Sequence, residues 1–202
     1  MNDRRHDVHV LEAARRTVER FGLQGATLER IAEEAGLSRT TLHRRGVSKD
    51  QVVARLTEDA AEAYRRALWP ALTSPGSGRE RLTEALTAIC RVAEENLELL
   101  LALGGQTDEV FHEDEGGEQM TRSDFTAPLE RLLRDGAADG SLRELDPTEY
   151  ATVIFNLVGW TYIHLRARHH WGSERAERTT LDVALNGLVH EADPAEANAS
   201  PR

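Results

Sequence analysis

Residues 27–45 read TLERIAEEAGLSRTTLHRR, and this stretch decides how the whole chain is interpreted. Ile31 and Leu42 fall where two short helices would bury apolar side chains against a third. Gly36 suits the turn between the two, because glycine adopts a positive φ without steric cost. Ser38 can then cap the second helix. Two short helices separated by so tight a turn predict a helix-turn-helix.

The outer face of the second short helix carries side chains that suit DNA. Hydroxyl and guanidinium groups bind phosphate oxygens and base edges in a major groove. On this face the sequence places Arg39, Thr40, Thr41, His43 and Arg44. The alternative is a plain helical hairpin with solvated arginines. The agreement of the apolar positions with the turn favours DNA binding.

Helical periodicity continues on both sides of the motif, and no stretch predicts a strand. An apolar stripe over 11–21 predicts a first helix, and Ser48 with Gln51 forms a capping box that opens a helix over 48–69. After a linker at 74–78, helices are expected over 82–100, within 106–117, and over 125–136, 147–169 and 174–190. The sequence therefore predicts an all-α protein of about nine helices.

The chain is expected to divide into a small head and a larger body. We predict a helix-turn-helix domain over 1–50, a helical body over 51–191 and a disordered tail over 192–202, with the helix over 48–69 connecting head and body. The first 50 residues hold 10 basic and 8 acidic side chains, whereas the rest hold 15 and 27. The charge difference has statistical scatter as its alternative explanation. Otherwise, an acidic body would confine DNA contact to one face.

The sequence also indicates in which cellular compartment the protein is expected. The N-terminus MNDRRHDVHV lacks the apolar core of a signal peptide, and no apolar run is long enough to span a bilayer. The single cysteine, Cys90, excludes an internal disulfide framework and a multi-cysteine zinc module. It lies in an apolar helical pattern, which predicts a buried, inert thiol. We expect a cytoplasmic protein without membrane association.

The first quarter of the chain resembles the TetR/AcrR family of transcriptional repressors. The matching positions are Phe21-Gly22, Thr27, Ile31-Ala32, Ala35-Gly36-Leu37-Ser38, Thr41-Leu42 and Ser48-Lys49. Three positions depart from the family pattern: His43 replaces a tyrosine, Arg45 a histidine or tyrosine, and Gly46 a phenylalanine. Because Gly46 has no side chain to pack, we expect a looser or differently anchored end of the recognition helix.

The resemblance implies roles for individual residues of the head. Arg39, Thr40 and Thr41 would face bases. The residues facing the DNA backbone would be Thr27, His43, Arg44, Arg45 and Lys49. Lys49 also falls at the start of a helix, where backbone N–H groups favour phosphate.

For the body, the resemblance implies dimerisation and a ligand pocket. The last two helices are the expected interface of a homodimer, through Val153, Leu157, Leu181, Ala184, Leu185 and Leu188. A pocket for a small molecule is expected at Phe111, Phe125, Phe155, Asn156, Trp160, Tyr162 and His164. For both sets the alternative is ordinary packing in the core of one chain.

The sequence contains no arrangement typical of an enzyme or a metal protein. It has no nucleophile elbow, phosphate-binding glycine loop or zinc-protease motif, so we expect no catalysis and no cofactor. His164 and His169 are five positions apart, which would turn them away from each other on a helix and argues against a metal. Glu94, Glu95 and Glu98 are interpreted as a solvated face.

These observations favour a DNA-binding transcriptional regulator that recognises a palindromic operator as a dimer. We expect a repressor that a small-molecule ligand releases from DNA. The alternatives are a helical regulator controlled by a protein partner, or a helical enzyme with an accidental helix-turn-helix match. An enclosed pocket in the body would favour the ligand, and a filled core the protein partner.

Overall fold

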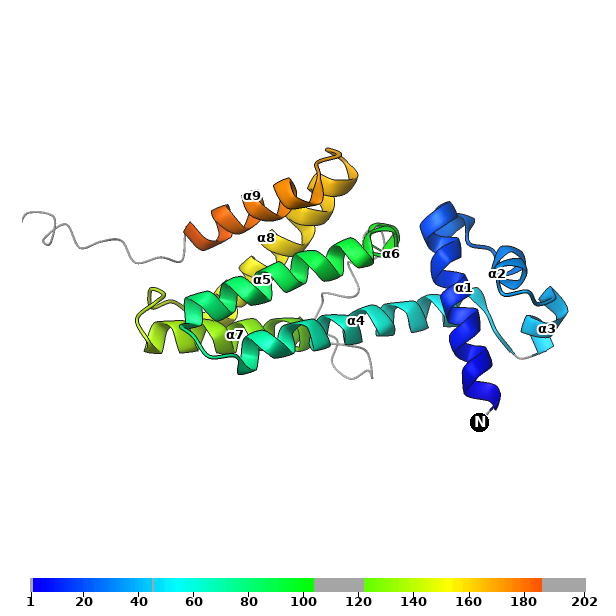
Figure 1. Ribbon diagram of the computed structural model, residues 1–202, viewed down its shortest axis with the longest axis horizontal. Helices are drawn as coiled ribbons and strands as arrows, with labels where there is room; N and C mark the ends of the chain where they lie inside the picture. The colour runs from blue at the N-terminus through cyan, green and yellow to red at the C-terminus, as the bar shows by residue number, and fades with distance from the viewer. Residues whose placement is uncertain (1, 45, 104–121, 187–202) are drawn as a thin grey trace, which may run out of the picture.

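The computed structural model describes residues 2–44, 46–103 and 122–186. Within these ranges the chain is helical and has no strand, which confirms the predicted all-α class. Figure 1 shows the first three helices gathered at one end and the remaining helices extending away from them. The helices are α1 (Asn2–Gly25), α2 (Leu28–Glu34), α3 (Arg39–Arg44), α4 (Lys49–Thr73), α5 (Gly78–Glu95), α6 (Leu97–Leu103), α7 (Arg122–Ala138), α8 (Pro147–Ala167) and α9 (Ser173–Asn186).

Two helices differ from the sequence prediction. The helix expected to stop near Trp69 continues through Pro70 to Thr73. Pro70 lies in the last turn, where its missing N–H removes only one helical hydrogen bond. The single helix expected over 82–100 is two helices, α5 and α6, separated at Asn96. The helix expected within 106–117 lies outside the described residues.

Two apolar cores lie along the molecule, and α4 contributes to both (Figure 1). The head core is formed by α1, α2, α3 and the first turns of α4, which supply Val52 and Leu56. Farther along α4, Tyr64 and Leu68 belong to the body core. Leu99 of α6 belongs to the head core, although α5 before it lies in the body core. The α5–α6 junction therefore joins the two cores.

Helix α5 is the central helix of the body. Its inner face buries Leu82, Leu86 and Cys90 completely. Burial raises the pKa of the Cys90 thiol to about 12, so the thiol stays protonated at neutral pH. The prediction that this cysteine is buried is confirmed.

Helices α5 and α7 cross with almost no space between their backbones. A Cβ atom built on Gly78 would lie 2.2 Å from the Cα atom of Gly136. Only glycine permits this approach, which seats the start of α5 on the end of α7. The same start is fixed by a capping box between Ser77 and Glu80.

Candidate nucleic-acid interface

The turn between α2 and α3 is fixed by a Schellman motif at Gly36. The N–H of Gly36 donates to the carbonyl of Glu33 at 3.0 Å, and that of Leu37 donates to the carbonyl of Ala32 at 2.8 Å. Gly36 has a φ of 63°, as the sequence predicted for this turn. Ile31 and Leu42 are buried on either side of it. The turn therefore directs the outer face of α3 into solvent.

Ser38 caps α3 as predicted. Its hydroxyl accepts from the N–H of Thr41 at 3.1 Å and lies 2.8 Å from the hydroxyl of Thr41. Thr41 is half-buried, whereas the exposed side chains on this helix are Arg39, Thr40, His43 and Arg44. The Arg39 guanidinium makes an ion pair with Glu29 of α2. The helix thus presents a compact row of hydrogen-bonding groups to solvent.

The end of α3 is anchored by backbone geometry instead of an aromatic side chain. The N–H of Gly46 donates to the carbonyl of His43 at 2.9 Å, and that of Val47 donates to the carbonyl of Leu42 at 3.1 Å. Together with the φ of 72° at Gly46, these bonds form a second Schellman motif. Val47 packs against the head core. The expectation of different anchoring is therefore correct: Val47 supplies an apolar contact one residue after Gly46.

Two further predicted DNA contacts lie at helix starts. The Thr27 hydroxyl caps α2 by accepting from the N–H of Arg30 at 3.4 Å. The Lys49 ammonium donates to the carbonyl of Gln24 at 3.4 Å, which brings the start of α4 beside the end of α1. Helix starts carry partial positive charge and unpaired N–H groups, which suit phosphate. Arg45 lies outside the described residues.

In the body, some predicted pocket residues meet in an aromatic cluster. Phe125 of α7 and Phe155 of α8 have ring centroids 5.5 Å apart, and Tyr64 of α4 lies 5.4 Å from the first and 5.9 Å from the second. The Tyr64 hydroxyl donates to the carbonyl of Phe125 at 2.6 Å, and burial raises its pKa. Sequence reasoning did not select Tyr64, because its helical periodicity was explained by the core.

The other described members of the predicted pocket are on α8: Asn156, Trp160, Tyr162 and His164. Asn156 and His164 are exposed on α8, and Trp160 is half-buried against the body core. Tyr162 is buried but directed to α5, where its hydroxyl donates to Glu94 at 2.8 Å. Phe111 lies outside the described residues.

The predicted interface residues are divided between surface and core. Val153 is 58% exposed. Leu157 and Leu185 are half-buried, and Leu181 and Ala184 pack in the body core of the single chain. Leu188 lies outside the described residues.

The expected separation of His164 and His169 is wrong. Helix α8 ends at Ala167, so His169 lies in the following turn and folds back. The two imidazole rings have centroids 5.1 Å apart. Even so, no group of three or more metal-ligating His, Cys, Asp or Glu side chains occurs among the described residues.

Glu94 is not part of a solvated face. Its carboxylate accepts from Nε and Nη2 of Arg166 at 2.7 and 2.6 Å, as well as from Tyr162. These hydrogen bonds, led by those from Arg166, lower the pKa of Glu94. Periodicity could not reveal the pairing, because Arg166 is 72 residues away in the chain.

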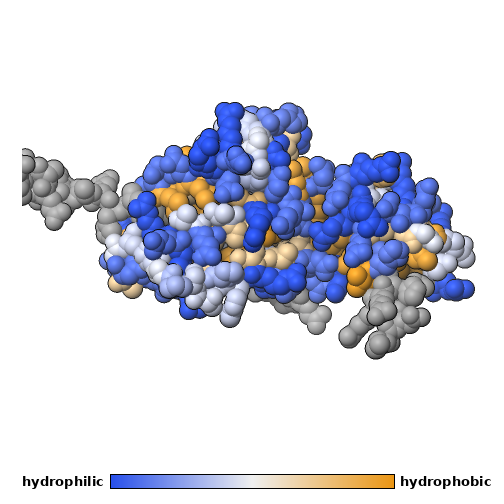
Figure 2. Space-filling model, in the orientation of Figure 1, coloured by the Kyte–Doolittle hydropathy of each residue, from blue (hydrophilic) through white to orange (hydrophobic). Residues whose placement is uncertain are grey.

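None of the helices in the described ranges has the length and apolar character required to cross a bilayer. Figure 2 shows hydrophilic residues over much of the visible face, with apolar surface over α9 at the left of the view. On that helix Val183 is 59% exposed. The body therefore has an apolar surface patch on its last helix.

Two family models match the chain. Residues 10–56 match bacterial regulatory proteins of the tetR family, and residues 75–188 match the tetracyclin repressor-like C-terminal domain. The two matches include α2, α3 and most of α1 at one end, and α5 to α9 at the other. No curated protein sequence matches the chain significantly.

Solved structures share the fold at low sequence identity. A transcriptional regulator from Saccharomonospora viridis in complex with choline aligns with a TM-score of 0.72 and 17% identity, covering 95% of this chain and 100% of its own. PfmR, a TetR family regulator from Thermus thermophilus, aligns with a TM-score of 0.67 and 21% identity, covering 90% of this chain and 99% of its own. AibR in complex with isovaleryl coenzyme A and operator DNA aligns with a TM-score of 0.65 and 16% identity, covering 89% of this chain and 97% of its own.

Proposed function

Because the chain belongs to the TetR family of bacterial regulatory proteins, we propose that it is a repressor that a small molecule releases from a palindromic operator. The family establishes a ligand-responsive, DNA-binding transcriptional regulator. Repression, the palindrome and the residues involved are our proposal. We further propose that residues 1–50 form the DNA-binding domain, 51–191 the ligand-binding and dimerisation domain, and 192–202 a tail.

The observation that carries this proposal is the geometry of α3. Its apolar side is anchored by Leu42, and a Schellman motif follows each of α2 and α3. We propose that Arg39, Thr40 and Thr41 read bases in the major groove. Phosphates are then contacted by Thr27, His43, Arg44, Arg45 and Lys49. Glycine-dependent turns lie at both ends of this helix, and a fixed position of the helix favours base reading.

A matched pair of arginine variants tests the surface. Arg44→Ala removes a proposed phosphate contact on α3, whereas Arg66→Ala removes an exposed arginine from the body part of α4. Duplexes are first selected by the wild-type protein from a randomised pool, and affinity is then measured by fluorescence anisotropy. We expect Arg44→Ala to weaken binding and reduce the salt slope by about 1, and Arg66→Ala to change neither. Equal effects of the two variants would refute this DNA surface.

We propose that two copies associate through α8 and α9. Val153 and Val183 are 58% and 59% exposed on these helices, and Leu157 and Leu185 remain half-buried. Burial of such apolar side chains against a second copy stabilises the dimer. Leu181, Ala184 and Leu188 complete the proposed interface. A dimer doubles the DNA contact, because its two recognition helices enter successive major grooves of a palindrome.

Sedimentation velocity distinguishes this interface from other surfaces. Val153→Asp places a charge in the proposed interface and is expected to yield monomers. Val8→Asp changes a valine of α1 that is 57% exposed and is expected to leave the dimer intact. A wild-type monomer, or a dimer that tolerates Val153→Asp, would contradict the assignment.

We propose that the ligand binds in the body beside the aromatic cluster of Tyr64, Phe125 and Phe155. Aromatic walls with a few polar groups are typical of small-molecule sites. The proposed lining also includes Phe111, Asn156, Trp160, Tyr162 and His164. The ligand would stabilise a body conformation in which the two heads no longer match the operator.

A thermal-shift screen of small molecules provides the test of the ligand site. Compounds that stabilise the wild-type protein should release the selected duplex. Phe155→Trp adds volume to the cluster and should abolish both effects while the protein still binds DNA. Compounds that stabilise both proteins equally would place the ligand elsewhere.

We also propose that the protein acts in the cytoplasm, where its operator would be accessible, and that its role is regulation without catalysis. The support is the family match itself, since regulators of this kind act by binding DNA. Fractionation of cells producing the full chain would test the compartment.

A further inference from the structure

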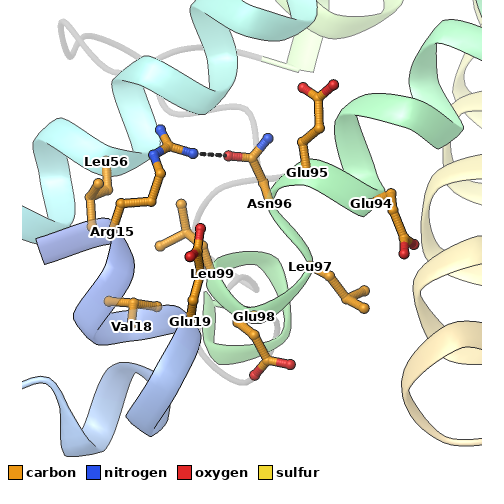
Figure 3. Close-up of a pocket in the computed structure, with 10 residues that line it drawn as sticks. All are labelled: Arg15, Val18, Glu19, Leu56, Glu94, Glu95, Asn96, Leu97, Glu98 and Leu99. Atoms are coloured by element: carbon orange, nitrogen blue, oxygen red, sulfur yellow. Dashed lines mark hydrogen bonds between the residues drawn. The ribbon is translucent and has the colours of Figure 1, made fainter. Parts of the chain in front are cut away.

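The head and the body meet at the break between α5 and α6, and the packing there is incomplete. A cavity of about 220 Å³ lies at this junction. Arg15, Val18 and Glu19 of α1 and Leu56 of α4 line one side, and residues 94–99 line the other (Figure 3). Beside the cavity, Leu99 of α6 packs in the head core, so apolar contact and open space lie side by side at this junction.

A hydrogen bond from Arg15 to Asn96 spans this junction (Figure 3). The Arg15 guanidinium donates to Oδ1 of Asn96 at 2.9 Å. Asn96 is only 5% exposed, and its Nδ2 donates to the carbonyl of Val92 at 2.8 Å. Its own carbonyl accepts from the N–H of Leu100, the first such bond of α6. These hydrogen bonds of a buried asparagine fix the break and tie it to α1.

Two residues earlier, Glu94 ties the same segment to α8. Figure 3 shows its side chain directed away from Arg15. Its carboxylate binds the Arg166 guanidinium through two nitrogens and also accepts from Tyr162. Arg166 donates in addition to the carbonyl of Trp171, in the turn before α9. Charge-assisted, two-point pairing of this kind holds both position and orientation.

We propose that residues 94–96 form a coupling segment that transmits displacements between α8 and α1. Glu94 is its body end and Asn96 its head end, so a shift of α8 relative to α5 moves the anchor of Arg15. The cavity provides space for this movement without a clash. Glu94 and Asn96 are positioning residues, since they act through Arg166 and Arg15. This inference rests on the proposed function only where it concerns DNA.

Hydrogen exchange on the full-length protein without DNA tests the coupling itself. Glu94→Gln breaks the body end, and Glu95→Gln is the matched control on the neighbouring exposed residue. We expect Glu94→Gln to raise amide exchange in α1 around residues 15–19 by about tenfold, with little change in Glu95→Gln. Unchanged exchange in α1 of Glu94→Gln, or an equal rise in Glu95→Gln, would overturn the proposal.

The reciprocal experiment uses Arg15 and Arg16, adjacent on α1. Arg15→Met removes the bond to Asn96, whereas Arg16→Met removes an ion pair to Glu34 that lies within the head. Coupling is reciprocal, so in the DNA-free protein Arg15→Met should raise exchange at residues 158–167 of α8, and Arg16→Met should not. Arg15→Lys, which retains a donor, should partly restore protection. Equal exchange in the two methionine variants would contradict the coupling.

Hydrogen exchange with added DNA separates this inference from the proposed function. Addition of the selected duplex should alter exchange at 158–167 in the wild-type protein and in Arg16→Met, and leave it unaltered in Arg15→Met. If Arg15→Met binds the duplex and α8 still responds, the coupling segment is refuted while the regulator remains. If no duplex is bound, the regulator fails, and the DNA-free comparisons still decide the coupling.

Discussion

Glu29 of α2 lies 2.6 Å from the guanidinium of Arg39 on α3. The ion pair joins the two helices of the helix-turn-helix at the start of the recognition helix. With the Arg39 and Glu29 side chains 68% and 54% exposed, it contributes little stability. We infer that it favours one orientation of the Arg39 side chain at the start of α3.

We predict that Arg39 reads a guanine in each half-site, since a guanidinium fits the O6 and N7 acceptors of guanine through two hydrogen bonds. Arg39→Ala should lose about 1–3 kcal/mol of discrimination at one base pair and little elsewhere. Competition anisotropy with singly substituted duplexes measures this loss. A uniform loss at all positions would identify Arg39 as a phosphate contact instead.

Gly46 is predicted to be needed for its backbone conformation. A Cβ atom there would meet nothing within 4 Å, but φ is 72°. Gly46→Ala should therefore destabilise the head by about 1 kcal/mol through left-handed strain alone. Chemical denaturation measures the change. If Gly46→Phe, which restores the family residue, proved stabilising, the Schellman motif would not be what anchors α3.

The crossing of α5 and α7 gives a prediction about the body. Gly78→Ala forces a Cβ atom to within 2.2 Å of the Gly136 backbone and should cost at least about 2 kcal/mol. Gly159→Ala, inside α8 with nothing within 4 Å of its Cβ, should instead stabilise by about 0.5–1 kcal/mol. Urea unfolding of both variants provides the comparison. Similar free energies of unfolding would show that the helices can move apart at little cost.

The stability contributed by Glu94 should depend on pH. Folding lowers the pKa of this carboxyl, chiefly through Arg166, so its contribution is present above the unfolded pKa and disappears as pH falls through the folded pKa. Glu94→Gln should lower the free energy of unfolding by about 1–2 kcal/mol at pH 7. This difference should shrink below about pH 4.3. A difference independent of pH would mean that the carboxylate charge is not involved.

Local signals allowed the head to be predicted well from the sequence. The turn at Gly36, the caps at Ser38 and Ser48 and the burial of Ile31 and Leu42 depend on neighbours within a few residues. Each has a recognisable residue type at a fixed spacing.

The body was harder to predict, because its decisive contacts join distant residues. At the break, the side chain of Asn96 accepts a hydrogen bond from Arg15, which lies 81 residues earlier. The crossing of Gly78 and Gly136 likewise leaves no mark in local periodicity. An apolar stripe also cannot show whether Leu181 faces its own core or a second copy.

If α3 recognises a specific DNA sequence, fluorescence anisotropy at two salt concentrations will reveal it. The wild-type protein is titrated with the fragment upstream of its own gene and with a scrambled duplex of equal length. We expect the upstream fragment to be preferred by about 10³-fold or more, with affinity falling steeply as salt rises. Equal, weak binding to the scrambled duplex and to every fragment of the surrounding chromosomal region would contradict it.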